Sequence, residues 1–255
     1  MLQQTQVGRV VPRWEHFTQR WPSAESFARA NLADVLRAWQ GLGYPRRAVA
    51  LHRAAAVIAQ SGWPVDEAGL RALPGVGEYT ARALLVLALR RRAPLPRDVN
   101  ISRVVARAAL GSEPAGALRA DIDAALDAGR PRSLDRRHYT YALFDVGAVH
   151  CRARPRCEGC PLVASCRSRR GGGSAPAARR TQPRYQGSMR QLRGRVLAGV
   201  LEGVTDATRL ERWVADCPAA ARPGAIEAAL DGLRRDGLIP AATARAGQPP
   251  SPGSS

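Results

Sequence analysis

The chain has 255 residues and a formal net charge of +18, and all 39 of its basic residues are arginines. No apolar stretch reaches the roughly 18 residues of a membrane span, and no basic start followed by an apolar core marks a signal peptide. A GC-rich genome explains arginine in place of lysine, but it does not explain why the chain has only 21 acidic residues against 39 basic ones. The charge therefore favours a polyanionic partner, most simply nucleic acid, and the lack of lysine excludes Schiff-base chemistry on a side-chain amine.

Apolar residues recur at helical spacing along most of the chain, and no alternating strand pattern appears. We therefore expect an all-α protein. The first helix starts almost at once, without a capping residue, and later helices are closed by Gly. The expected helices lie near residues 7–17, 32–43, 46–62, 65–92 (two helices around a turn), 98–110, 117–128 and 135–149.

Composition divides the chain into five predicted parts. Residues 1–112 form a helical domain and 113–168 a cysteine-containing module, and the Arg/Gly-rich residues 169–187 form a flexible linker. Residues 188–243 are predicted to form a small winged-helix-like segment. A tail at 244–255 is disordered by composition.

The string LPGVG separates two of these helices at Leu73–Gly77. Glycines let the backbone turn tightly and approach another surface, so the N–H groups around Gly75, Val76 and Gly77 can meet a phosphate at the start of a helix. The alternative is an ordinary turn between helices. The string resembles the helix-hairpin-helix of DNA repair proteins, and together with the basic charge this favours contact with DNA.

Asp98 stands at the start of the next helix, in LPRDVNISRVVAR. Taken alone, it is most simply a helix N-cap. The order of hairpin, Pro/Gly loop and capping Asp resembles the helix-hairpin-helix DNA glycosylase superfamily, in which this Asp faces the sugar of an extruded nucleotide. A carboxylate there stabilises the oxocarbenium-like charge that develops as the glycosidic bond breaks.

Four cysteines, Cys151, Cys157, Cys160 and Cys166, have the spacing C-x5-C-x2-C-x5-C. Structural zinc usually uses two separated C-x-x-C pairs, and only one is present, so spacing favours a 4Fe–4S cluster over zinc. The arginines at 152, 154 and 156 either contact phosphates or form a solvated charge run. Cys217 stands apart and is expected to be a small core residue.

With these motifs, residues 1–168 resemble the MutY-type adenine DNA glycosylases, a family that removes adenine mispaired with 8-oxoguanine. The specific strings are MLQQTQV, GLGY, LPGVGEYTA, DVN and DVGAVHCRARPRCEGCPLVASC. The resemblance implies a helix-hairpin-helix glycosylase barrel with an iron–sulfur module. In the related pattern the first cysteine gap has six residues, one more than here.

The resemblance also implies roles for single residues. Gln4, Thr5 and Leu42 correspond to residues that contact the base opposite the adenine. Tyr44 corresponds to an aromatic wedge that supports base flipping. Tyr79 and Asn100 correspond to residues that position Asp98 and the attacking water. The structural alternatives are a solvated helix face for the glutamines and a packed turn aromatic for Tyr44.

The related endonuclease III type uses a hairpin lysine as a lyase nucleophile, and Tyr79 stands at that position here. The expected activity is therefore hydrolysis alone, on double-stranded DNA with mispaired adenine, by a monomeric, cytoplasmic, nucleoid-associated bacterial protein that does not bind membranes. Two alternatives remain: another monofunctional mismatch glycosylase, acting for example on thymine or uracil, and a non-catalytic DNA-binding protein.

Two departures from the family pattern concern the ends. In relatives the first motif reads Glu-x-Met-Leu-Gln-Gln-Thr, and its Glu protonates adenine; here it would lie two residues before Met1. Either the start was assigned too far downstream, which the intact Tyr79, Asp98 and Asn100 favour, or the product is truncated. General acid catalysis contributes roughly 10²–10⁴-fold, so we expect the 255-residue chain to be severely impaired. The segment after Arg184 is too short and too helical for the MutT-like domain that helps many relatives to read 8-oxoguanine.

Overall fold

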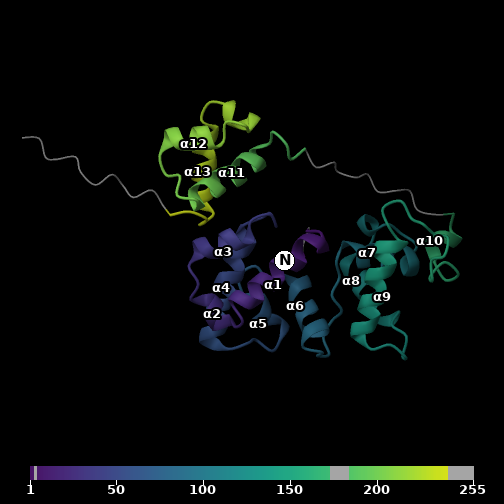
Figure 1. Ribbon diagram of the computed structural model, residues 1–255. Coiled ribbons are helices and arrows are strands. Elements are labelled where there is room, and N and C mark those ends of the chain that lie inside the picture. The colour runs from purple at the N-terminus through teal and green to yellow at the C-terminus, as the bar shows by residue number, and fades with distance from the viewer. Residues whose placement is uncertain (3–4, 173–183, 241–255) are drawn as a thin grey trace, which may run out of the picture. The chain divides into compact units, whose positions relative to one another are not determined.

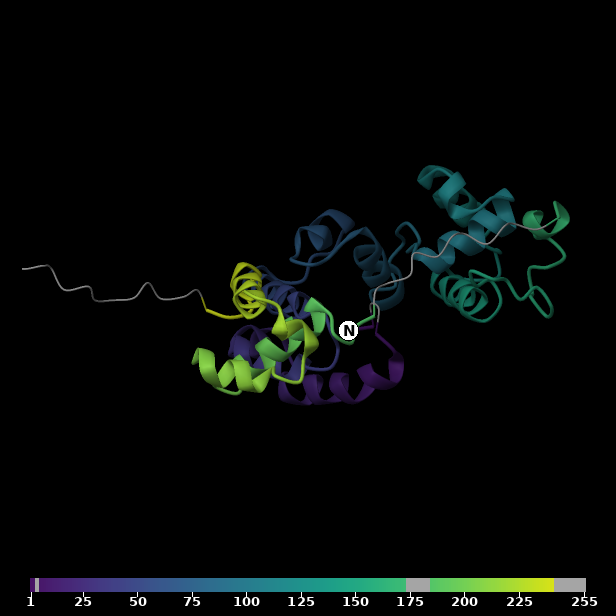
Figure 2. The same ribbon diagram turned by 90° about the horizontal axis from the view of Figure 1, so that it is seen from above.

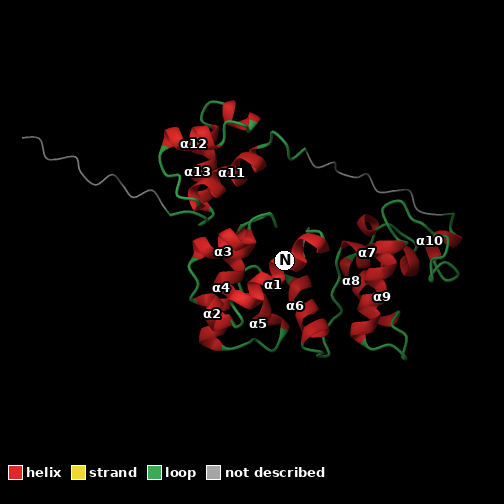
Figure 3. Cartoon of the chain, viewed as in Figure 1, coloured by secondary structure: helices red, strands yellow, loops and turns green. Residues whose placement is uncertain are grey.

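The computed structural model describes residues 1–2, 5–172 and 184–240, and within these ranges it contains helices and turns but no strand, as expected from the sequence (Figures 1 and 3). The chain forms two compact units. The first unit contains Met1–Gly62 and Gln182–Ser255, and the second unit contains Trp63–Thr181. In the described part of the chain, no helix is both long and apolar enough to cross a bilayer.

The described residues of the N-terminal part of the first unit form helices α1 to α4. α1 (Val7–Arg20) begins without a side-chain cap, as its sequence predicts, and is followed by α2 (Ala24–Ala28), α3 (Leu32–Trp39) and α4 (Arg46–Ser61). Phe17 of α1 packs edge-on against Trp39 of α3 and lies next to Phe27 of α2. These buried rings anchor the helices to one core.

The C-terminal segment belongs to the same unit. α11 (Met189–Leu201), α12 (Ala207–Trp213) and α13 (Ala225–Arg235) share a continuous buried core with α1, α3 and α4. Arg37 of α3 donates two hydrogen bonds, of 3.1 and 2.7 Å, to the Leu201 carbonyl at the end of α11. This charge-assisted contact satisfies a carbonyl that helix geometry leaves open. The division into two units does not test the predicted boundaries at 112, 168, 187 and 243, which remain predictions. Residues 173–183 and 241–255 lie outside the described ranges.

The second unit carries the hairpin and the cysteines. Its buried core is formed mainly by Val86, Ile101, Val104 and Leu126. The elements are α5 (Glu67–Ala72), α6 (Glu78–Ala83), η1 (Leu84–Ala88), α7 (Val99–Val105), η2 (Ala106–Leu110), η3 (Pro114–Gly116), α8 (Arg119–Ala128), α9 (Arg136–Val149) and α10 (Arg167–Arg170). The helices α6 and α7 continue into the wider π-type turns η1 and η2, and α7 packs along α9 (Figures 1 and 2).

Candidate active site and cysteine loop

The turn between α5 and α6 has the geometry that its glycines predict. Gly75 has a φ of +77°, which favours glycine, and the Val76 N–H donates to the Leu73 carbonyl at 3.1 Å. Gly77 caps α6, and a Cβ built on it would meet no atom within 4 Å. Both glycines are exposed, so an external group can approach the backbone at the start of α6.

Asp98 is the N-cap of α7, as the simplest reading of its sequence predicts. Its Oδ1 accepts hydrogen bonds from the backbone N–H groups of Asn100 at 2.9 Å and Ile101 at 2.7 Å. Its Oδ2 accepts one from Nδ2 of Asn100 at 2.9 Å. Capping thus fixes the carboxylate in one orientation. The side chain is only half-buried, so its negative charge remains available to a neighbouring ligand.

Tyr79 is the second residue of α6 and is half-buried. Burial, together with the negative charge of Asp98, raises the pKa of the Tyr79 hydroxyl above its usual value of 10.0. The hydroxyl is therefore protonated at neutral pH and is a hydrogen-bond donor. The second unit thus brings Tyr79, Asp98 and Asn100 into one neighbourhood.

A chain of hydrogen bonds leads from Asp98 to the cysteine loop. Oδ1 of Asn100 accepts from Nη2 of Arg103 at 2.8 Å, and Nε of Arg103 donates to the Cys151 carbonyl at 2.6 Å. Gly147 of α9 lies against Asn100, and a Cβ built on it would be 2.9 Å from Cβ of Asn100. Sequence reasoning missed Arg103 and Gly147. The only available signals were a glycine inside a predicted helix and an arginine one turn after the capping motif.

Arg107 anchors the same loop from η2 and is also absent from the sequence prediction. Its side chain is 3% exposed, pairs with Glu113 at 2.7 Å, and donates to the Arg152 carbonyl at 2.6 Å. Nη1 also lies 3.9 Å from Sγ of Cys151. Burial raises the pKa of the Cys151 thiol, and Arg107 opposes that rise.

The four predicted cysteine ligands line one cavity of about 260 Å³ in the second unit. All four are free thiols of intermediate exposure, so the donor set and the space suit a compact thiolate-bound centre. In the described residues, no three potential ligands are arranged around a point that would hold a single metal ion. Arg152, Arg154 and Arg156 are exposed on this loop, and Cys217 is buried in the core of the first unit, as expected.

The remaining predicted residues lie in the first unit. Oγ1 of Thr5 donates to the Leu42 carbonyl at 3.1 Å, and the Leu42 side chain is buried in the core. Tyr44 has a φ of +48°, unusual for a residue with a side chain, and the residue is 48% exposed. The Arg47 guanidinium lies 5.5 Å from the centre of that ring. Gln4 falls outside the described residues.

Comparison with known proteins agrees with these features. A sequence profile described as HhH-GPD superfamily base excision DNA repair protein matches residues 1–122. The adenine DNA glycosylase of Mycolicibacterium smegmatis is 42% identical over 246 residues, which cover 94% of this chain and 81% of that protein. The chain belongs to the adenine DNA glycosylase family.

Further relatives are similar in sequence, and two solved structures share the fold. The adenine DNA glycosylase of Mycobacterium tuberculosis strain H37Rv is 42% identical over 94% of this chain and 79% of its own length. The human adenine DNA glycosylase is 33% identical over 66% of this chain and 32% of its own length. A thermostable thymine-DNA glycosylase superimposes with a TM-score of 0.60 at 25% identity, over 67% of this chain and 80% of its own. An endonuclease III–DNA complex shares the fold, with a TM-score of 0.56 at 20% identity, over 66% of this chain and 79% of its own.

Proposed function

We propose that this adenine DNA glycosylase family member hydrolyses the N-glycosidic bond of adenine mispaired with 8-oxoguanine or guanine in double-stranded DNA. The observation that carries the proposal is Asp98, a half-buried carboxylate fixed by Asn100 and by the α7 backbone, beside a protonated Tyr79. A preoriented negative charge favours the transition state of base loss over the neutral substrate.

The reaction breaks the bond between the adenine nitrogen and the sugar carbon, and the bonding electron pair leaves with the base. Asp98 stabilises the positive charge that develops on the sugar, and Asn100 and Tyr79 keep that carboxylate in place. Water then adds to the sugar carbon and loses a proton, which leaves free adenine and an abasic site. The family resemblance assigns protonation of the adenine to a glutamate two residues before Met1. With no lysine in the sequence, the proposed reaction ends at the abasic site.

DNA is held at two places in this proposal. The backbone of the exposed Gly75 and Gly77, with Val76 between them, contacts a phosphate. The exposed Tyr44 side chain enters the base stack, which assists flipping. The net charge of +18 supports binding to a polyanion. Thr5 and Gln4 lie next to the opposite base, and Leu42, whose side chain is buried, contributes its backbone there. The chain acts as a monomer.

The four cysteines that line the 260 Å³ cavity hold a 4Fe–4S cluster in this proposal. Such a cluster supplies a compact cross-link among four thiolates, and its reduction potential depends on the hydrogen bonds to its sulfurs. Arg107 and Arg103 bind the loop that carries the first of these cysteines. Cys217 is not a ligand.

The test is single-turnover release of free base from duplexes with A opposite 8-oxoguanine, A opposite G, T opposite G and U opposite G. The 255-residue chain is compared with an extended chain that carries Met-Glu-Ala ahead of Met1, and with a matched Met-Gln-Ala control. We expect the extended chain to release adenine alone, roughly 10²–10⁴-fold faster than the control, and Asp98→Asn to abolish release. Strand cleavage without alkali should not occur.

Each other outcome overturns part of the proposal. Release of thymine or uracil in place of adenine identifies a different mismatch glycosylase. Tight binding of all duplexes without release by the extended chain identifies a non-catalytic DNA-binding protein. Release that survives Asp98→Asn removes Asp98 from the active site.

A further inference from the structure

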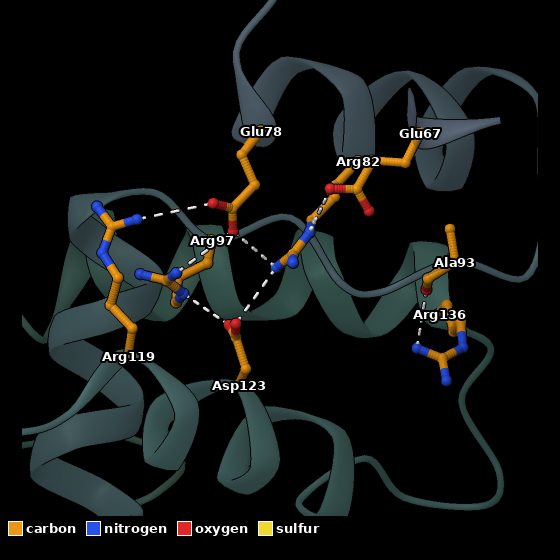
Figure 4. Close-up of polar contacts among 8 residues, drawn as sticks. All are labelled: Glu67, Glu78, Arg82, Ala93, Arg97, Arg119, Asp123 and Arg136. Carbon is orange, nitrogen blue, oxygen red and sulfur yellow. Dashed lines mark hydrogen bonds and ion pairs between the residues drawn. The ribbon is translucent and has the colours of Figure 1, made fainter. Parts of the chain in front are cut away.

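An ion-pair network in the second unit reaches the residue that precedes Asp98. The Arg97 side chain is only 10% exposed; its Nε donates to Oδ1 of Asp123 at 2.6 Å, and its Nη2 lies 3.5 Å from Oε1 of Glu78 (Figure 4). Asp123 belongs to α8, and Glu78 is the first residue of α6. One guanidinium therefore ties the segment that enters α7 to the start of α6 and to the middle of α8.

The same network reaches the residue that precedes Tyr79, which is Glu78. Nη1 of Arg82 lies 3.0 Å from Oε1 of Glu78 and 3.4 Å from Oδ2 of Asp123, and the Arg82 side chain is only 14% exposed. Figure 4 shows the Asp123 carboxylate between the Arg97 and Arg82 guanidiniums. At the edges of the network, Glu67 pairs with Arg82 and the exposed Arg119 pairs with Glu78.

Asp123 is the central element of this arrangement. It carries the negative charge between two largely buried guanidiniums, and each guanidinium also contacts Glu78. Loss of its charge would leave Arg97 to share the single carboxylate of Glu78 with Arg82 and Arg119, and a poorly compensated buried charge moves toward water. The Arg97 peptide leads directly into Asp98, so loss of the contacts that anchor the Arg97 side chain frees the segment that enters α7 to shift. Displacement would thus reach Asp98 through a single peptide unit.

We propose that Asp123 and Arg97 are positioning residues, which fix the start of α7 relative to the start of α6 so that Asp98 and Tyr79 keep their spacing. This inference rests on the proposed function of Asp98. Stabilisation of a developing positive charge requires a carboxylate that is already in place, because reorganisation during the reaction reduces the benefit. A merely structural network would affect stability and leave unchanged the selectivity of the site, which is its preference for a positively charged ligand over a neutral one.

The selectivity can be measured without turnover. A duplex with a pyrrolidine, a cationic mimic of the oxocarbenium sugar, is compared with a duplex that has the neutral tetrahydrofuran analogue at the same position. The ratio of their dissociation constants reports how well the site recognises positive charge. We expect the 255-residue chain to bind the cationic duplex more tightly, by about tenfold or more, the size of one hydrogen bond to a charged group, and Asp98→Asn to abolish this preference.

Two variants test the positioning role. Asp123→Asn removes the central charge, and Arg97→Lys keeps the charge but loses the planar fork that contacts two carboxylates. We expect each to lower the preference by roughly fivefold or more, with affinity for the neutral duplex changed less than about twofold. The matched control is Asp127→Asn, which removes the same charge from the same helix at a separate ion pair, with Arg136 at 2.8 Å.

The possible failures are distinguishable. An unchanged preference in both Asp123→Asn and Arg97→Lys overturns the positioning role while Asp98→Asn still confirms the site. A loss in Asp123→Asn that Asp127→Asn reproduces in full is a charge effect and also overturns it. Equal preference in the parent chain and in Asp98→Asn overturns the proposed function itself. Should Asp123→Asn fail to fold, Arg97→Lys decides the question.

Discussion

Nδ2 of Asn100 donates a hydrogen bond of 2.9 Å to Oδ2 of Asp98, while Oδ1 of the same carboxylate accepts the backbone N–H groups of Asn100 and Ile101. The helix cap and the orientation of the proposed catalytic carboxylate are therefore one arrangement. The cap uses one oxygen. Asn100 controls the other through its side chain.

Because the backbone and the side chain of Asn100 bind different oxygens of Asp98, Asn100→Ala separates the helix cap from the orientation of the carboxylate. The cap hydrogen bonds come from the backbone and remain, but the hydrogen bond from Arg103 to Oδ1 of Asn100 is lost, so we expect the free energy of unfolding to fall by only about 1 kcal/mol. Orientation of Oδ2 is lost, and a hydrogen bond to a charged group contributes about 1.5–3 kcal/mol, so the rate of adenine release by the extended chain should fall roughly 10–100-fold. Single-turnover release and thermal unfolding measure the two effects. A rate within twofold of the parent would exclude the orienting role.

A side chain at position 147 would collide with Asn100. A Cβ at this position would lie 2.9 Å from Cβ of Asn100 and 3.5 Å from its backbone carbon, so α7 and α9 must separate. We expect Gly147→Ala to destabilise the protein by about 1–3 kcal/mol, as overpacking does, and to lower adenine release as well.

The matched control for that change is Gly8→Ala in α1, where a Cβ would meet nothing within 4 Å. An Ala at an open helical position stabilises by up to about 1 kcal/mol. Thermal unfolding of both variants should therefore give shifts of opposite sign. Equal shifts would mean that contact with Asn100 does not determine the effect.

If the four cysteines of the loop hold a cluster, the metal content of the chain depends on them and not on the fifth cysteine, Cys217. We expect the purified chain to contain iron and acid-labile sulfide in equal amounts, and Cys160→Ser to lose both. Cys217→Ser, which changes a buried cysteine of the other unit, should keep them. Elemental analysis and labile-sulfide assay measure this. One zinc per chain without sulfide would assign the loop to a structural zinc site.

Helical periodicity was sufficient to predict the all-α fold, because the helices bury regular apolar faces. The hairpin and the cap at Asp98 were also predictable, since Gly75 and Asp98 are the residue types that such local backbone geometry requires. These features depend on neighbours within a few positions. The cysteine spacing is local in the same sense.

Arg97, Arg103 and Asp123 were not predictable, because each contacts a part of the chain that is distant in sequence. In an arginine-rich chain the sequence does not distinguish a buried arginine from an exposed one. Only the tertiary structure shows that Arg97 contacts Asp123, 26 positions later. The packing of the C-terminal helices on α3 is a similar case, since Arg37 meets the Leu201 carbonyl across 164 positions. Sequence reasoning identified Asp98 and its neighbours Asn100 and Tyr79, but not Arg97, Arg103 and Asp123, which contact other parts of the chain.

The raised pKa of Tyr79 predicts how stability changes at alkaline pH. In the folded chain the hydroxyl keeps its proton above its ordinary pKa of 10.0, because burial and the charge of Asp98 oppose ionisation. The unfolded chain ionises first, so unfolding is favoured as the pH rises through about 10. The stability present below that pH is thus progressively lost above it.

Tyr79→Phe removes this ionisation, so the free energy of unfolding should fall less between about pH 8 and pH 10.5 than in the parent chain. Tyr141→Phe, at an exposed tyrosine of the same unit, should leave the parent's pH dependence in place. Urea unfolding at the two pH values measures the difference. An identical fall in all three proteins would show that Tyr79 ionises with the same pKa in the folded and unfolded chain, and that Asp98 does not act on its hydroxyl.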